Sequence, residues 1–512
     1  MSNHIFIGCD IGTSGTKAVA ADSSGNILAQ AAETYSIIQL HNNWAEQEPD
    51  VWLEAAVSTL RSVIEQLPSG TDISSICISA LYGGTGVMCD EHMNSIRPPL
   101  IWMDRRAEQE SSHIRSTLGE ELLFKTTGNG IDSYFGFTKL LWVQKNEPEN
   151  WAKIKHILPI HSYIIYKMTG QLCVDYCSAG NMGGIYDQHT HSWSEEMCSK
   201  LNIPYSALPS DFHNPSDVIG MLNKDFQRKL GLDHPVAMCT GTVDCIASML
   251  SAGIVHPGDN AAVLGTSLNW GLVHGDKLKD PTLVSMPYCI TPRQLNYTYG
   301  GASTAGALPR WFAAQFMDSD SLLAYQELEA SIARQNIAPG AEGLVLLPYF
   351  MGERTPIWDE NATGVLFGLT LSHTKAHIYR AVLESVAYSL LHIIESMTGG
   401  SLAVQKIVLV GGGARSELWK QIFADVTGLP VYTPIQDIEA PLGDAFLAAV
   451  GSGSIREYSV IESWITMKPA VLPNKQHHLA YKEYFELYKE LYLKLKETMS
   501  KRAGMLKPDL PQ

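Results

Sequence analysis

The sequence predicts an α/β protein of two domains built on mixed sheets. Three observations support this prediction. The chain has 512 residues, well beyond the roughly 250–300 residues at which a single hydrophobic core stops growing. Short apolar runs typical of strands alternate with segments of helical periodicity. A strand–turn–strand pattern at the start of the chain also recurs about half-way along it, as an internal repeat would.

Composition narrows the function classes. Apolar residues make up 45% of the chain and charged residues 18%, and the formal net charge is −16. With no long basic run, nucleic acid is a poor partner. No apolar run reaches the roughly 20 residues of a membrane helix, and the N-terminus lacks signal-peptide features. The nine cysteines are dispersed, which indicates buried thiols of a reducing compartment. We therefore expect a cytoplasmic protein without a membrane or nucleic-acid partner.

The first 35 residues predict a β-meander. Residues 4–9, 17–21 and 27–32 read as strands, and the turn at residues 10–16 is rich in Gly and Thr. Because Gly15-Thr16-Lys17 leads into a strand and not a helix, a P-loop is disfavoured. The hydroxyls and unhindered backbone N–H groups of such a turn can surround phosphate oxygens. An ordinary β-turn is the alternative.

The same pattern recurs at residues 260–273, where strand residues flank Gly265-Thr266-Ser267. Duplication of a domain with a phosphate-facing hairpin explains both copies. Turn residues near positions 246–258 place the domain boundary there, which gives domains of residues 1–250 and 251–512. We expect residues 476–501 to form a solvated amphipathic helix.

Two carboxylates and a glycine run are candidates for phosphoryl-transfer chemistry, which needs phosphate donors, a metal ligand and a base. Asp10 ends an apolar strand directly before the first turn, where a metal ligand or a turn cap is expected. Asp244 lies between a short strand and an apolar helical run, so its position alone fits a helix N-cap or a catalytic base. The glycines at 411–413 allow close approach of a flat ligand such as adenosine, or form a tight turn.

Taken in order, these motifs resemble the FGGY family of carbohydrate kinases over nearly the whole chain. The resemblance is carried by Asp10-Ile-Gly-Thr-Ser-Gly-Thr-Lys17, Gly265-Thr-Ser267, Gly411-Gly-Gly-Ala-Arg-Ser416 and Gly241-Thr-Val-Asp244. It is also carried by Ile101-Trp-Met-Asp104-Arg-Arg106, by the Gly-Glu-Arg-Thr-Pro segment at 352–356 and by the C-terminal signature at 364–384.

The resemblance implies two actin-like ATPase (ribonuclease H-like) domains with a cleft between them, and ATP and Mg²⁺ as cofactors. Asp244 would be the catalytic base for a terminal hydroxyl of a sugar or polyol, and Asp10 would lie at the metal. A homodimer is one assembly that the resemblance suggests. The positions that it assigns to ATP are Gly12, Thr13, Ser14, Thr16, Lys17, Gly265, Thr266, Ser267, Gly306, Arg310, Gly412, Gly413 and Glu417.

The substrate prediction rests on fewer residues. The segment Ala80-Leu-Tyr-Gly-Gly-Thr-Gly86 stands where xylulose-acting members carry Gln-Met-His-Gly and glycerol kinases carry Arg-Glu. Tyr134 corresponds to the substrate-stacking Tyr of glycerol kinases, although Gly136 departs from the family's N-terminal signature. The implied substrate residues are Tyr82, Gly84, Asp104, Tyr134 and Asp244.

With few charged groups among them, a pentulose such as xylulose is favoured. Gluconate or another polyol or ketose is the alternative within the family. A non-kinase actin-like ATPase and a sugar-responsive regulator are more distant alternatives.

Overall fold

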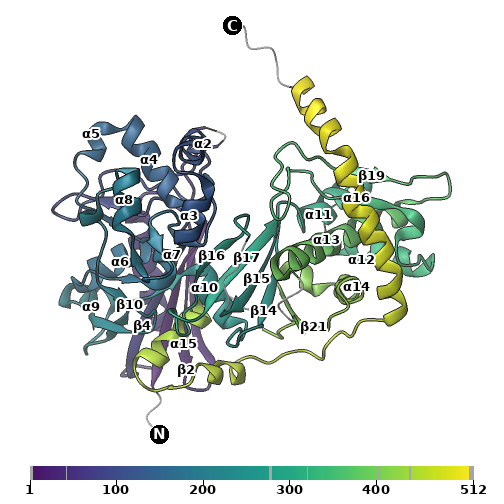
Figure 1. The fold of residues 1–512 in the computed structure, drawn as a ribbon. Coiled ribbons are helices and arrows are strands. Elements are labelled where there is room, and N and C mark those ends of the chain that lie inside the picture. Colours follow the sequence, from purple (N-terminus) through teal and green to yellow (C-terminus); the bar gives the residue numbers. More distant parts are fainter. Residues whose placement is uncertain are drawn as a thin grey trace. The chain divides into compact units, whose positions relative to one another are not determined.

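The computed structural model describes residues 4–41, 43–275, 280–319, 321–399, 404–436 and 440–506 (Figure 1). The chain divides into two compact units, both discontinuous in sequence. Unit 1 comprises Met1–Pro257, Val273–Thr298 and Ile438–Thr466, and unit 2 comprises Gly258–Leu272, Tyr299–Asp437 and Met467–Gln512. The sequence suggests a single domain boundary near residue 250, whereas in this division Val273–Thr298 and Ile438–Thr466 also belong to the first unit.

Unit 1 is built on a seven-stranded mixed sheet in the order β11-β12-β4-β1-β2-β3, with β13 also paired to β4. Strands β1, β2 and β3 form the antiparallel meander predicted from the sequence, and β1, β12 and β13 each run parallel to β4 where they pair with it. The strands are β1 (Ile5–Ile11), β2 (Gly15–Asp22), β3 (Ile27–Thr34), β4 (Ile73–Ala80), β11 (Val218–Met221), β12 (Ala237–Cys239) and β13 (Thr242–Val243).

Both faces of β1 are buried, which explains its nearly continuous apolar sequence. Ile5, Ile7 and the other odd-numbered residues pack in one core with Trp52 of α1 (Pro49–Gln66). The opposite face receives α15 (Ala440–Gly451) at Gly8, where a Cβ atom would lie 1.9 Å from the carbonyl oxygen of Pro441. Gly8 therefore lets a helix from late in the sequence pack directly on the first strand.

The remaining elements of unit 1 surround this sheet. The helices are α2 (Glu108–Thr117), α3 (Glu120–Thr127), α4 (Gly136–Asn146), α5 (Pro148–Trp151), α6 (Ile160–Thr169), α7 (Tyr176–Asn181), α8 (Glu195–Leu201), α9 (Lys224–Leu230) and α10 (Asp244–Ser251), with 3-10 helices at Tyr205–Ala207 and Tyr458–Ser463. The strands are β5 (Val87–Cys89), β6 (His156–Leu158), β7 (Val174–Asp175), β8 (Tyr186–Asp187), β9 (Ser192–Trp193), β10 (Phe212–His213) and β16 (Val284–Pro287).

Unit 2 repeats the strand order of unit 1. Its sheet runs β17-β15-β14-β20-β21, with β14 antiparallel to β15 and parallel to β20. The strands are β14 (Asn260–Leu264), β15 (Leu268–His274), β17 (Asn296–Ala302), β20 (Ile407–Val410) and β21 (Val431–Tyr432). Strands β14, β15 and β20 thus occupy the places that β1, β2 and β4 hold in unit 1, as the predicted duplication requires.

The other elements of unit 2 are mainly helical. They are α11 (Ala307–Phe316), α12 (Leu322–Arg334), α13 (Lys375–Thr398), α14 (Glu417–Thr427) and α16 (Lys475–Leu506), the strands β18 (Val345–Leu347) and β19 (Val365–Phe367), and 3-10 helices at Ala341–Gly343 and Gly412–Arg415. Among the described residues, no helix is both long enough and apolar enough to span a bilayer.

The predicted C-terminal helix forms, but the expectation that it is solvated holds for only one of its faces. Helix α16, yellow in Figure 1, packs along α13 through buried aromatic residues. The Tyr481 hydroxyl donates to Glu384 at 2.8 Å and accepts from Arg380 at 2.8 Å. A buried tyrosine needs a partner for its hydroxyl. The hydrogen bonds of Tyr481 to Glu384 and Arg380 therefore fix how α16 packs on α13.

Candidate active site

The carboxyl ends of the parallel strands bring two predicted carboxylates and the predicted phosphate turn of unit 1 together. Across β1 and β4, Asp10 lies opposite Ser79, and across β4 and β13, Ser79 lies opposite Thr242. Asp244 follows β13 directly as the first residue of α10. Ligands of open α/β sheets bind at this edge. Asp10, the turn after it and Asp244 therefore share one end of the sheet.

Asp244 is half-buried and is not the N-cap of its helix. The N-cap is Val243, and the Asp244 Oδ1 atom accepts a hydrogen bond from the backbone N–H of Cys245 at 2.6 Å. Burial raises the pKa of Asp244 to about 6, although this hydrogen bond acts to lower it. A carboxylate with that pKa is mostly ionised at neutral pH and can accept a proton.

The raised pKa predicts the pH dependence of turnover. If Asp244 must be ionised, kcat/KM for the sugar should be half-maximal near pH 6, and it should fall about tenfold per pH unit below that. The measurement is a pH profile of kcat/KM with saturating nucleotide, after the nucleotide KM has been determined at each pH. A profile that stays flat well below pH 6 contradicts the assignment.

Asp10 belongs to a buried chain of polar groups. The Ser79 hydroxyl lies 3.2 Å from Asp10 Oδ1 and 2.6 Å from Asp444 Oδ2. Asp444 comes from α15 and is fully buried. Burial, followed by the nearby charge of Asp10, raises the pKa of Asp444 well above its ordinary value. One hydroxyl proton cannot serve both carboxylates, so a protonated Asp444 that donates to Ser79 completes the chain.

The protonated state of Asp444 makes stability depend on pH. A buried acid with a raised pKa ionises on unfolding, so its contribution opposes folding increasingly as pH rises from the unfolded value of about 3.9 toward the folded one. We expect Asp444→Asn to make the thermal midpoint fall less steeply as pH rises above about 4. The exposed Asp225→Asn variant is the control. A fall as steep in Asp444→Asn as in the wild type would show that Asp444 is ionised in the folded protein.

The first turn exposes some of its predicted phosphate ligands and hides one. Ser14 and Lys17 are exposed, and Gly12 and Thr13 are half-buried. The Thr13 carbonyl accepts from the Gln47 amide at 2.7 Å. By contrast Thr16 is fully buried, with its hydroxyl 3.2 Å from that of Tyr35. The turn therefore presents Thr13 and Ser14, while the Thr16 side chain serves the core of the meander.

Of the predicted sugar-binding residues other than Asp244, Tyr134 is partly exposed, whereas Tyr82, Gly84 and Asp104 are buried. Tyr134 is half-buried. Tyr82 is buried, with its hydroxyl 3.8 Å from the Met182 sulfur. At Gly84 a Cβ atom would lie 2.0 Å from the Leu100 carbonyl oxygen, so this glycine permits a close backbone crossing.

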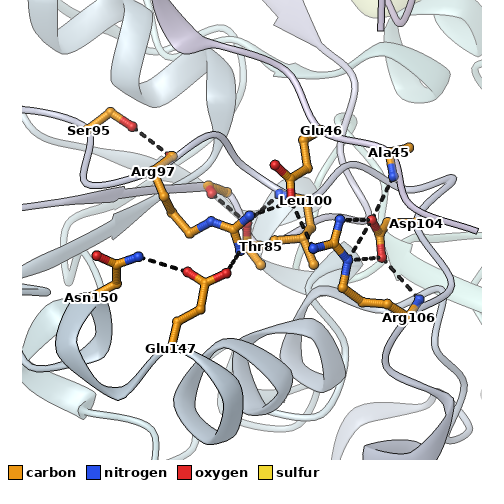
Figure 2. A network of polar contacts seen from close by, with 11 residues as sticks. Ala45, Glu46, Thr85, Ser95, Arg97, Leu100, Asp104, Arg106, Glu147 and Asn150 are labelled. Carbon is orange, nitrogen blue, oxygen red and sulfur yellow. Dashed lines mark hydrogen bonds and ion pairs between the residues drawn. The ribbon is translucent and has the colours of Figure 1, made fainter. Parts of the chain in front are cut away.

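Asp104 is fully buried and engaged in an ion network, as Figure 2 shows. Its Oδ2 atom accepts from the Ala45 N–H and from Arg106 Nη2, both at 2.7 Å. Arg106 also reaches Glu46 at 2.8 Å, and Glu46 in turn contacts Arg97. The side chain of Asp104 thus fixes the loop at residues 101–106 against the backbone at Ala45.

Trp102 lies where a substrate residue is expected, although sequence reasoning did not single it out. The residue is 37% exposed, and its Nε1–H donates to the Thr13 hydroxyl at 3.0 Å. A Cβ atom on Gly83 would lie 3.1 Å from Trp102 Cβ and 2.9 Å from the Tyr134 hydroxyl. Trp102, Tyr134 and Gly83 therefore lie together beside the first turn. The tryptophan of the Trp-x-Asp-x-Arg segment was the feature of the sequence that could have indicated a role for Trp102.

The predicted nucleotide residues of unit 2 also converge at one edge of its sheet. The Gly306 N–H donates to the Gly265 carbonyl at 2.9 Å. Gly411 follows β20 beside β14, and a Cβ atom there would lie 2.6 Å from the Leu264 carbonyl oxygen. The exposed residues of this edge are Gly265, Thr266, Arg310, Gly412 and Glu417, with Ser267 and Gly413 half-buried. The Glu417 carboxylate lies 2.7 Å from Lys420 Nζ.

The donor set of unit 1 fits a Mg²⁺ ion held with nucleotide phosphates. Mg²⁺ keeps several waters and is commonly bound by only one or two carboxylates together with phosphates. The Asp10 carboxylate at this edge could be one such ligand. Among the described residues, no group of three His, Cys, Asp or Glu side chains is placed to hold a metal.

Fold and site together define a class. Two units repeat the strand order of an actin-like domain, with carboxylates at the strand ends of the first and glycine-rich turns at those of the second. The model of the N-terminal domain of the FGGY family of carbohydrate kinases matches residues 5–251, and the model of its C-terminal domain matches residues 260–452. The chain belongs to the FGGY family of carbohydrate kinases.

Relatives match over the full length of the chain. A xylulose kinase of Staphylococcus epidermidis is 28% identical over 515 residues, covering 99% of each chain. A gluconokinase of Bacillus licheniformis is 28% identical over 511 residues, covering 98% of each. The crystal structure of xylulose kinase from Rhodospirillum rubrum superposes with a TM-score of 0.91 at 27% identity, covering 97% of this chain and 100% of that one. These findings confirm the predicted fold of two actin-like domains and the predicted sugar kinase activity.

Proposed function

We propose that the protein transfers the γ-phosphoryl group of ATP to a terminal hydroxyl of a pentulose such as xylulose. The observation that carries this proposal is the position of Asp244, half-buried at the strand edge that also holds Asp10 and the Thr13 turn. Relatives of this length are named xylulose kinase, which supports the choice of substrate.

In the proposed mechanism Asp244 accepts the proton of the attacking hydroxyl. Trp102 and Tyr134 orient the sugar carbon chain so that this hydroxyl faces Asp244, which supplies the proximity part of the rate enhancement. In unit 1, Thr13 and Ser14 would donate to phosphate oxygens and Asp10 would hold the metal. In unit 2, the turn at 265–267 would bind the nucleotide. Bound Mg²⁺ would offset charge on the phosphates. Transfer to the sugar then needs a base, an oriented acceptor and phosphate donors, and these residues supply each of them.

Gluconate is the second candidate, because a gluconokinase matches at the same 28% identity. The residues beside the first turn argue for the neutral sugar. Trp102, Tyr134 and Gly83 themselves offer ring faces and a hydroxyl, and the nearby Arg105 is ion-paired with Asp132 at 2.7 Å. The Lys139 ammonium behind them is fully buried and donates to the Gly83 carbonyl. A carboxylate bound beside the rings would therefore lose hydration for little direct ion pairing in return.

A panel of acceptors distinguishes the candidates. ADP release is measured with xylulose, other pentuloses, hexuloses, polyols and gluconate at equal concentrations. We expect the highest kcat/KM with a pentulose and at least tenfold less with gluconate, a difference of about 1.4 kcal/mol. A higher kcat/KM with gluconate than with any pentulose would make gluconate the substrate. No stimulation by any acceptor would refute the proposed function.

A further inference from the structure

We propose that Lys139 is a positioning residue that fixes two backbone segments of the sugar site, at Gly83 and at Tyr134, and thereby sets the affinity for the sugar. This inference rests on the proposed function, because it concerns how the same site recognises its substrate. Lys139 lies on α4, and it was assigned no role from the sequence.

The ammonium group of Lys139 joins two segments that are far apart in sequence. Its Nζ atom donates to the Gly83 carbonyl at 2.8 Å and also to the Tyr134 carbonyl. It lies 5.7 Å from the centroid of the Tyr134 ring, within the range of a cation–π contact. One side chain thus ties the loop after β4 to the loop before α4.

The position of Lys139 is costly, which argues for a role beyond packing. The residue is 0% exposed, and within the described parts of the chain no carboxylate lies at ion-pair distance from its ammonium. Burial, then the charges of Arg105 and Arg106, lower the pKa of Lys139 to about 7, against the partial support of Asp104 and Asp132. Uncharged residues fill such a site at lower free energy.

The Gly83 loop that Lys139 holds is built on close backbone contacts. Gly83 has a φ of 81°, in the left-handed region that favours glycine. At Gly136, the first residue of α4, a Cβ atom would lie 2.0 Å from the Gly84 carbonyl oxygen. The glycine loop therefore packs backbone against backbone, and the lysine adds a directed hydrogen bond to it.

These contacts place Lys139 directly behind the sugar-facing groups. Gly83 approaches both Trp102 and the Tyr134 hydroxyl, so a shift of its loop would change the separation of the two rings. Each tenfold loss of affinity corresponds to about 1.4 kcal/mol, on the order of one net hydrogen bond to the sugar. Loss of the lysine should therefore weaken sugar binding more than it weakens nucleotide binding, which uses other residues.

The test compares Lys139→Met with Lys145→Met, a lysine on the same helix whose exposed side chain pairs with Glu110. We expect Lys139→Met to raise the sugar KM about 10–100-fold, with kcat and the ATP KM changed less than about threefold. Lys145→Met should match the wild type. Lys139→Gln keeps two N–H donors without the charge, and its sugar KM should lie between those of wild type and Lys139→Met.

Two outcomes would overturn the inference. In the first, the sugar KM of Lys139→Met and Lys139→Gln is unchanged. In the second, the KM values for both sugar and ATP rise while kcat and the thermal midpoint fall in both variants, as for a residue with only a structural role. Hydrogen exchange of the segments 82–86 and 132–136 provides a readout without substrate. If no sugar is turned over by the wild type, the proposed function fails, and faster exchange of these segments in Lys139→Met still supports the positioning role, whereas unchanged exchange refutes it.

Discussion

Asp244→Asn should lower kcat for the best sugar about 10²–10⁴-fold, the usual contribution of a positioned general base. The amide keeps the size of the side chain and can still accept from the Cys245 N–H through its oxygen, but it cannot take the proton of the attacking hydroxyl. Because the change removes proton transfer and not binding, we expect the sugar KM to stay within about threefold of the wild-type value.

The measurement is steady-state ADP release with sugar and ATP varied separately. Asp225→Asn is the matched control, because Asp225 lies exposed in the first turn of α9, away from the strand edge. Equal rates for Asp244→Asn and wild type would remove Asp244 from the mechanism. A large rise in KM with unchanged kcat would instead make it a binding residue.

Glu46→Gln should destabilise unit 1 by roughly 3–5 kcal/mol, the range for breaking a buried ion pair by removing one partner. The Glu46 carboxylate lies between two buried guanidinium groups, at 2.5 Å from Arg97 and 2.8 Å from Arg106 (Figure 2). The side chains of Arg97 and Arg106 are only 7% and 2% exposed. The neutral amide would leave both positive charges with less compensation in a site of low dielectric.

Thermal unfolding and limited proteolysis of the loop that carries Trp102 measure this effect. Glu65→Gln is the control, because Glu65 forms an exposed pair with Arg61 on α1, and such surface pairs contribute about 0–1 kcal/mol. We expect a large fall in the midpoint for Glu46→Gln and almost none for Glu65→Gln. Similar midpoints for the two variants would mean that water or rearrangement compensates the buried arginines.

Local sequence patterns were sufficient for the strands and turns that frame the site. The meander at β1–β3, the hairpin at β14–β15 and strand β20 all form where alternation and glycine turns predict them. These elements depend on neighbours a few residues apart, so a local pattern carries the information. The repeat of the Gly-Thr turn likewise indicated a repeated sheet, which the common strand order of the two units bears out.

Contacts between distant residues were not accessible in the same way. That α15 packs on β1 at Gly8, and brings Asp444 to Ser79, depends on segments more than 350 residues apart. The buried positions of Thr16 and Asp104 likewise involve partners elsewhere in the chain, namely Tyr35 and Ala45. A motif shows which residue types are present but not which way each side chain points.

The sequence by itself determined the family, the two-domain α/β fold and the candidate carboxylates Asp10 and Asp244, because these follow from motif order and local periodicity. Only the tertiary structure decided that Asp244 begins its helix without capping it, that Trp102 contacts the first turn and that a buried lysine holds the Gly83 loop. The physical reason is that burial and hydrogen-bond geometry are set by packing between segments, and packing is a property of the whole chain.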